Sequence, residues 1–122
     1  MEYELQPLRI IAGWKVDWNT FYEVDPTSET MHYFEGSSLL QLSNYNLYRS
    51  IDLEWRPEKD VNGEFILRVI NISTSINPKT KKEVYDFDWE DLYLEFSSKS
   101  RKEIIEKIEL LMLQLPPFIQ KK

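Results

Sequence analysis

The sequence predicts an α+β fold, with a mostly antiparallel β-sheet arranged as a meander and packed by a C-terminal α-helix. Three runs of alternating apolar residues follow one another between residues 50 and 89, with turn-forming residues between them. Such runs are typical of consecutive antiparallel strands. One stretch with helical spacing follows between residues 100 and 115. Strands followed by a helix, rather than alternating with helices, indicate an α+β protein. A length of 122 residues suits a single domain over 1–122.

The N-terminal part predicts short extended elements separated by turns. Trp14–Trp18 alternates apolar and polar residues with the period of a half-buried strand. Two polar residues separate it from a second apolar run, Phe21–Val24. Asp25–Glu29 has turn chemistry, because proline restricts φ and the Asp and Ser side chains bond to nearby amides. A further short apolar element, 31–34, ends before Gly36.

The middle of the chain predicts two long neighbouring strands. Ser50–Arg56 alternates, and Pro57 ends it because proline cannot donate to a ladder. Asn62-Gly63 predicts a tight reversal with positive φ angles. Glu64–Ser73 is then expected as a long strand. Its apolar residues divide between two faces, with Phe65, Leu67 and Val69 on one and Ile66, Ile70 and Ile72 on the other. This strand is therefore expected to be covered at least in part on both sides.

A turn, a third strand and the helix complete the predicted fold. Asn77–Thr80 predicts the turn and Glu83–Trp89 the strand. Ser100 is expected to cap the helix, and Glu103 completes the pattern of a capping box. The predicted apolar face of the helix comprises Ile104, Ile105, Ile108, Leu111, Met112 and Leu115. The Pro-Pro pair that follows ends the helix.

The composition excludes several classes of function. The chain has no Cys, one His and three separated Gly residues, so it has no disulfide, no thiolate site and no glycine-rich phosphate loop. His32 has no partner of known catalytic spacing, and Ser37 and Ser38 lack the nucleophile-elbow pattern. We therefore expect no enzyme and assign no catalytic, metal or cofactor residue. The N-terminus lacks a signal peptide and no run is long enough to span a membrane, so a cytoplasmic protein is expected.

The charge is unevenly distributed along the chain, whose formal net charge is −6. Residues 1–47 carry −5 and residues 86–98 another −5, whereas residues 48–85 carry +1 and residues 99–122 carry +3. A negative surface repels phosphate backbones, so nucleic acid is not an expected partner. It attracts basic proteins and speeds their association. Acidity that serves solubility alone is the competing interpretation.

The segment Asp86–Asp91 alternates acidic residues with Phe87 and Trp89. In a strand, Asp86, Asp88 and Glu90 would share one face, and the two aromatic rings would point to the core. The segment suits a solvated acidic face, a surface for a partner protein, or a carboxylate site for a metal ion or acid–base chemistry. The partner interpretation assigns Asp86, Asp88, Glu90 and Asp91 as first contacts and Glu23, Asp25 and Glu29 as second contacts.

The aromatic residues are numerous, with four Trp, seven Tyr and six Phe. Each Trp lies in an alternating pattern, so core packing is the default expectation for Trp14, Trp18, Trp55 and Trp89. Some of the tyrosines must be exposed, because so many polar-tipped rings cannot all be buried. Exposed aromatic residues beside carboxylates are typical of a protein-binding surface.

Two stretches resemble the small proteins encoded beside secreted polymorphic toxins in Bacillus-type bacteria. The first comprises Trp14-Lys15-Val16, Asn19, Phe21-Tyr22-Glu23 and Asp25-Pro26, and the second comprises Ile51–Pro57 and Asn62–Leu67. The C-terminal Phe96, Ser100–Lys107 and Met112 also fit the strand-then-helix ending of that group. The likeness extends over about half of the chain.

The resemblance implies an immunity protein, which is a cytoplasmic inhibitor that binds the C-terminal domain of a cognate toxin. Such toxins are often nucleases with basic clefts. The acidic segments would then occupy the place of the phosphates of the nucleic-acid substrate. A monomer is the simpler expectation, since nothing in the sequence demands an oligomer. Two alternatives stay open: an acidic adaptor without a toxin partner, and a carboxylate-based metal-binding protein or enzyme.

Overall fold

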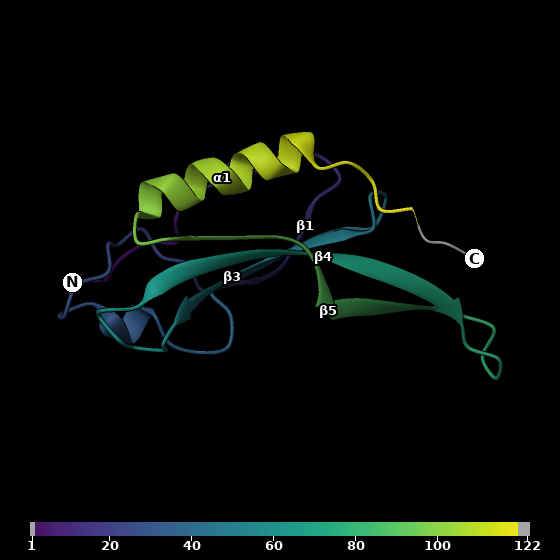
Figure 1. Ribbon diagram of the computed structural model, residues 1–122, viewed down its shortest axis with the longest axis horizontal. Coiled ribbons are helices and arrows are strands. Elements are labelled where there is room, and N and C mark those ends of the chain that lie inside the picture. The colour runs from purple at the N-terminus through teal and green to yellow at the C-terminus, as the bar shows by residue number, and fades with distance from the viewer. Residues whose placement is uncertain (1, 120–122) are drawn as a thin grey trace.

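The computed structural model describes residues 2–119, in which five strands form one sheet and one α-helix lies across a face of that sheet (Figure 1). The elements are β1 (Lys15–Asn19), the 3-10 helix η1 (Met31–Tyr33), β2 (Leu40–Asn44), β3 (Arg49–Arg56), β4 (Glu64–Ile76), β5 (Glu83–Ser98) and α1 (Arg101–Gln114). The strands are neighbours in chain order and every pairing is antiparallel. The predicted α+β meander with a C-terminal helix is confirmed.

The first third of the chain departs from the sequence-based expectation. β2 was not predicted, although Leu40–Ser43 alternates apolar and polar residues. The expected element Phe21–Val24 is not a strand. Tyr22 instead forms an isolated bridge with Leu5, and the Phe21 carbonyl accepts the Gln6 amide at 2.8 Å. The N-terminal segment thus takes the backbone groups that a further strand would need.

The register divides the side chains of the sheet between two faces, since residues that lie opposite each other in a ladder point to the same side. On one face, Leu40, Leu53, Leu67 and Phe96 form one row, and Leu42, Ile51, Val69 and Leu94 form the next. These residues belong to or pack against the main hydrophobic core, which also contains Ile104 and Ile108 of α1. We call this the helix-covered face.

The other face, which we call the helix-free face, carries the alternate residues of the same strands. They include Gln41, Ser43, Ser50, Asp52, Glu54, Ile66, Arg68 and Ile70. Ile70 and Ile72 are fully buried there, outside the main core cluster. The predicted division of the β4 residues between two faces is therefore confirmed. The expectation that residues on this second face are also partly covered is confirmed as well, because Ile70 and Ile72 are buried.

The helix begins and packs largely as predicted. The Ser100 hydroxyl accepts the Glu103 amide at 3.2 Å, and the Ser100 amide donates to the Ser98 hydroxyl. The buried residues are Ile104, Ile108, Leu111, Met112 and Leu115, while Ile105 is half-buried. Within the described residues, no helix is long and apolar enough to cross a membrane.

The reversal between β3 and β4 differs from the predicted tight turn at Asn62-Gly63. The loop spans residues 57–63, and its positive φ angle, 60°, belongs to Lys59. Gly63 is needed for a different reason, because a Cβ there would lie 2.6 Å from the Arg56 carbonyl oxygen. The Trp55 indole closes this loop by donating to the Asp60 carbonyl at 2.9 Å. The glycine thus permits close approach of two backbone segments rather than a left-handed conformation.

Candidate functional site

The β4–β5 ladder consists of two parts separated by an irregularity in β5. Ile70 lies opposite Leu92, but the next residue of β4, Asn71, lies opposite Asp88. Residues 89–91 therefore have no counterpart in β4 and form a bulge, which bends a strand and breaks its alternation. The Asp88 carboxylate accepts the Glu90 amide at 3.1 Å and the Asp91 amide at 3.2 Å. These bonds satisfy two amides that the ladder leaves unpaired.

Beyond the bulge, β4 and β5 continue as a two-stranded hairpin of residues 71–88. Figure 1 shows β5 bending sharply along its length and the hairpin reaching past the C-terminal end of α1. Its turn is closed as predicted at Asn77, whose side chain accepts the Lys79 amide at 2.9 Å and the Thr80 amide at 3.2 Å. The hairpin therefore extends beyond the part of the sheet that α1 covers.

Exposed aromatic residues gather on this hairpin and its bulge. Tyr85 is 40% exposed, Phe87 36% and Trp89 49%, whereas Tyr93, which is 46% exposed, lies beyond the bulge and packs on Arg49. The predicted core positions of Phe87 and Trp89 are wrong, because no second layer covers this part of β5. The prediction is also wrong for Trp18, which is 53% exposed on the edge strand β1. It is confirmed for the other two tryptophans, Trp14 and Trp55, which are buried.

The four first-choice carboxylates lie close together in the chain but do not form one stripe. Asp86 and Asp88 point to the side opposite Phe87, as strand alternation requires. Glu90 and Asp91 lie in the bulge, where no ladder pairing fixes a face, so the expectation that Glu90 shares a face with the two aspartates stays a prediction. All four residues are exposed.

A buried arginine packs beneath the bulge. The Arg49 guanidinium lies 4.1 Å from the centre of the Tyr93 ring and donates to Asn71 and, at 3.0 Å, to the Pro116 carbonyl. Desolvation lowers the pKa of Arg49, and the nearby Tyr93 hydroxyl opposes part of that effect. Arg49 ties β3, β4 and the segment after α1 together at the position where β5 bends.

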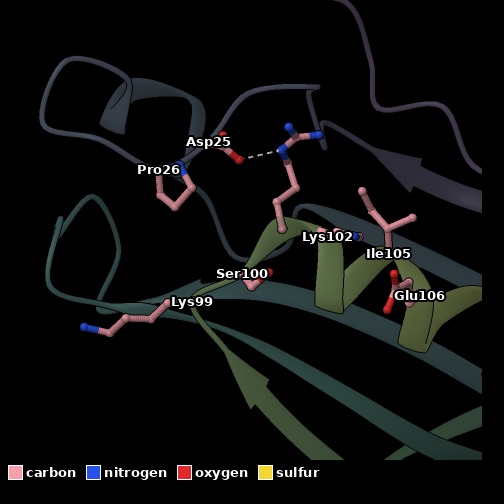
Figure 2. Close-up of a pocket in the computed structure, with 8 residues that line it drawn as sticks. Asp25, Pro26, Lys99, Ser100, Lys102, Ile105 and Glu106 are labelled. Atoms are coloured by element: carbon pink, nitrogen blue, oxygen red, sulfur yellow. Dashed lines mark hydrogen bonds and ion pairs between the residues drawn. The ribbon is translucent and has the colours of Figure 1, made fainter.

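The second-choice carboxylates lie at the other end of the molecule, around the start of α1. Asp25 accepts from Arg101 at 3.0 Å, and both residues line a hollow of about 670 Å³ with Lys99, Ser100 and Lys102 (Figure 2). Glu23 and Glu29 are exposed in the same loop region. The hairpin extends beyond the opposite end of the helix, so the structure does not bring the two acidic sets together (Figure 1).

The helix-free face has a polar floor that the sequence did not reveal. Ser43 is fully buried and donates to the Asp17 carboxylate, while Ser50 donates to the Leu42 carbonyl at 2.9 Å. Asp52 is also buried and accepts from Ser38 at 2.6 Å and from Gln41 at 3.3 Å. Burial raises the pKa of Asp52, although these two hydrogen bonds act in the opposite direction.

Three hollows follow one another over this floor and share lining residues. Their volumes are about 530, 270 and 190 Å³. Trp18 lines the first two, and Asp17 and Gln41 line the last two. Phe87 and Trp89 form a wall of the third, so the hairpin borders the helix-free face. The exposed tryptophans of β1 and β5 therefore border a single acidic and hydroxyl-rich surface.

The residues weighed for catalysis lie near one another without forming a catalytic pair. His32, Ser37 and Ser38 line the largest of the three hollows. His32 packs on the Tyr33 ring at 4.3 Å, and the Ser38 hydroxyl is committed to Asp52. Among residues 2–119, no hydrogen bond joins the imidazole to either serine, as an activated nucleophile requires. In the same described part of the chain, no three His, Cys, Asp or Glu side chains converge as metal ligands would.

Sequence reasoning missed Asp17, Trp18, Ser43, Ser50 and Tyr45 as members of this surface. Asp17 and Trp18 occupy a bulged edge strand, and the serines lie on β2 and β3, each next to an apolar residue that faces the helix-covered side. This alternation with Leu42 and Ile51 is the sequence signal that indicates the two serines. No protein-family model, no curated protein and no solved structure matches the chain.

Proposed function

We propose that this chain is a protein-binding inhibitor, and specifically an immunity protein that acts in the cytoplasm by occupying a cognate toxin domain. The observation that supports it most strongly is the group of exposed rings on the β4–β5 hairpin and its bulge, Tyr85, Phe87 and Trp89, set among exposed carboxylates. Exposed aromatic residues anchor protein interfaces, and surrounding charges steer the encounter.

The hairpin suits this role because it combines a projecting shape with a rigid base. The Asp88 hydrogen bonds hold the bulge, and Arg49 fixes the strands beneath it. A prearranged surface loses little conformational entropy on binding, which favours tight association. The resemblance to toxin-associated immunity proteins directs the proposal to a toxin domain, and the acidic surface suits a basic, nuclease-like cleft.

The direct experiment is binding to the purified toxin domain encoded beside this gene. We expect a 1:1 complex, with an association rate that falls as salt rises because screening weakens the steering. Co-expression should also protect cells from that domain. If the neighbouring gene encodes no toxin, or if the purified domain does not bind, the immunity proposal is wrong and an adaptor role becomes the better one.

Two matched triple variants locate the interface. Asp86→Lys, Glu90→Lys and Asp91→Lys change the hairpin, while Asp88 is left intact because it holds the bulge. Glu23→Lys, Glu29→Lys and Glu106→Lys make the same change in charge at exposed positions elsewhere. The hairpin variant should weaken binding by about tenfold or more, mainly through slower association. A larger loss from the control variant would move the interface to the second acidic set.

A further inference from the structure

The third hollow on the helix-free face, about 190 Å³ in volume, is a small pocket with aromatic walls and a polar floor. Tyr45, Phe87 and Trp89 form the walls, and Asp17, Gln41, Ser43 and Ser50 form the floor. Its volume is far more than a single water molecule requires. The side chain of Asp17 remains 24% exposed, so its carboxylate is accessible from outside.

The donor hydrogen atoms of the floor side chains already take part in hydrogen bonds within the protein. The single hydroxyl hydrogen of Ser43 goes to Asp17, and that of Ser50 goes to the Leu42 carbonyl. The Gln41 amide group donates to Ser38 at 3.2 Å and to Asp52. What the floor offers to a ligand is therefore oxygen lone pairs, on the Asp17 carboxylate and on the serine hydroxyls. Such a floor favours a ligand that only donates.

The walls restrict the ligand further. An aromatic face attracts a cation through its quadrupole, and a planar guanidinium stacks on such faces better than a compact ammonium does. A guanidinium also carries five N–H donors and no acceptor, which matches the acceptor-rich floor. The one carboxylate in the lining, Asp17, supplies the negative charge that attracts such a cation.

We infer that this pocket binds an arginine side chain of the partner protein, with its guanidinium on Asp17 and its flat face against Phe87 and Trp89. The inference rests on the proposed protein-binding function, because it assigns the residue type that the partner inserts. Lys15, which does not line the pocket, forms a loose ion pair with Asp17, with its ammonium 3.9 Å from the carboxylate and its side chain 70% exposed. The incoming arginine displaces this loose contact.

The experiment is an NMR titration of the isotopically labelled full chain with N-acetyl-arginine methylamide. The citrulline analogue, which has the same shape without the charge, and the lysine analogue are the comparison probes. The arginine probe should shift the Trp89 indole signal and the amide signals around Ser43 and Ser50. The citrulline probe should bind about tenfold more weakly, as expected when a charged hydrogen bond is lost.

Three variants test the assigned roles. Asp17→Asn should weaken arginine binding by about tenfold, whereas Asp91→Asn removes the same charge outside the pocket and should change it little. Trp89→Leu should weaken binding through loss of the aromatic face. Lys15→Ala should strengthen it by about two- to fivefold, because a competing surface ion pair is removed. A purely structural role of Lys15 does not produce that gain.

The inference is overturned if citrulline or lysine binds as well as arginine, or if Asp17→Asn and Asp91→Asn behave alike. The probe contains no partner protein, so this result is separate from the toxin-binding experiment. If the toxin domain binds Asp17→Asn with full affinity, the pocket assignment fails and the proposed function stands. If the arginine probe binds as described but the toxin domain does not, the proposed function fails and the chemistry of the pocket stands.

Discussion

The two faces of the sheet are built from the same strands but bury their side chains differently. On the helix-covered face, Leu53 and Leu67 are completely inaccessible, and α1 closes the layer above them. On the helix-free face, their neighbours Glu54 and Ile66 are half-buried, and polar side chains bond to one another. In the described part of the molecule the helix covers one face, which supplies the apolar core, whereas the other face buries a polar network and leaves Glu54 and Ile66 partly exposed.

The difference shows that residue type alone does not assign a side chain to the core. Trp55 and Trp89 are both tryptophans in alternating strand segments, yet one is 2% exposed and the other 49%. Trp55 lies among Phe34 and Phe65, whereas Trp89 lies in a bulge beyond the reach of α1. The exposed Trp89 ring is therefore part of the surface on which the proposed partner interface depends.

The largest expected effect is a difference in stability between alanine variants of these two tryptophans. Trp55→Ala should lower the free energy of unfolding by about 3–5 kcal/mol, because it opens a cavity in the aromatic core. Trp89→Ala should lower it by only about 0.5 kcal/mol, as is usual for a surface position. Urea unfolding monitored by circular dichroism measures both. A loss of several kcal/mol from Trp89→Ala would show that the bulge belongs to the folded core.

A smaller difference is expected between two adjacent residues of β4. Leu67→Ala, on the helix-covered face, should cost about 2–5 kcal/mol, and Ile66→Ala, on the helix-free face, about 1 kcal/mol. Both changes shorten an aliphatic side chain to the same methyl group, so each controls for the other. Equal costs in the same unfolding experiment would contradict the asymmetry of the two faces.

The smallest effect is a dependence of stability on pH that arises from the helix-free face. Burial raises the pKa of Asp52 in the folded state. The folded chain therefore binds this proton at a pH where the unfolded chain has released it, and the contribution of Asp52 to stability falls as pH rises through the folded pKa. Asp52→Asn removes this contribution, because an amide does not titrate.

Unfolding measured from neutral pH down to about pH 4, the ordinary range of the carboxyl, tests this linkage. The wild-type chain should gain stability relative to Asp52→Asn as pH falls through the raised pKa of Asp52. Glu106→Gln, at an exposed position on α1, controls for the loss of one charge. Parallel curves for the wild type and Asp52→Asn would exclude Asp52 as the source of the difference.

Local pattern predicted the regular elements well because each of them obeys a short-range rule. The Ser100 cap and the apolar spacing from Ile104 to Leu115 identified α1, and the alternation of Phe65, Leu67 and Val69 identified one face of β4. The turn at Asn77 also formed as expected, because its side chain bonds to amides two and three residues later. None of these features depends on a distant part of the chain.

The elements that sequence reasoning missed depend on distant partners. β2 consists of five residues that become a strand because β1 and β3 lie on either side of it. At the site, the exposure of the four first-choice acids around Asp88 agrees with a surface segment, but the bulge that separates them was not foreseen. The bulge results from the register between β4 and β5, which pairs Asn71 with Asp88 and Ile70 with Leu92. No local sequence pattern indicates this register.

The sequence by itself determined the fold class, the position and capping of the helix, and the alternation of β3 and β4, because helix and strand periods are local properties of the chain. Only the tertiary structure decided which face of the sheet the helix covers, since the described chain supplies one α-helix for two faces. It also turned Phe87 and Trp89 from expected core residues into the exposed wall of a pocket. The physical reason is that a bulge and a strand register are set by pairing between segments far apart in the sequence.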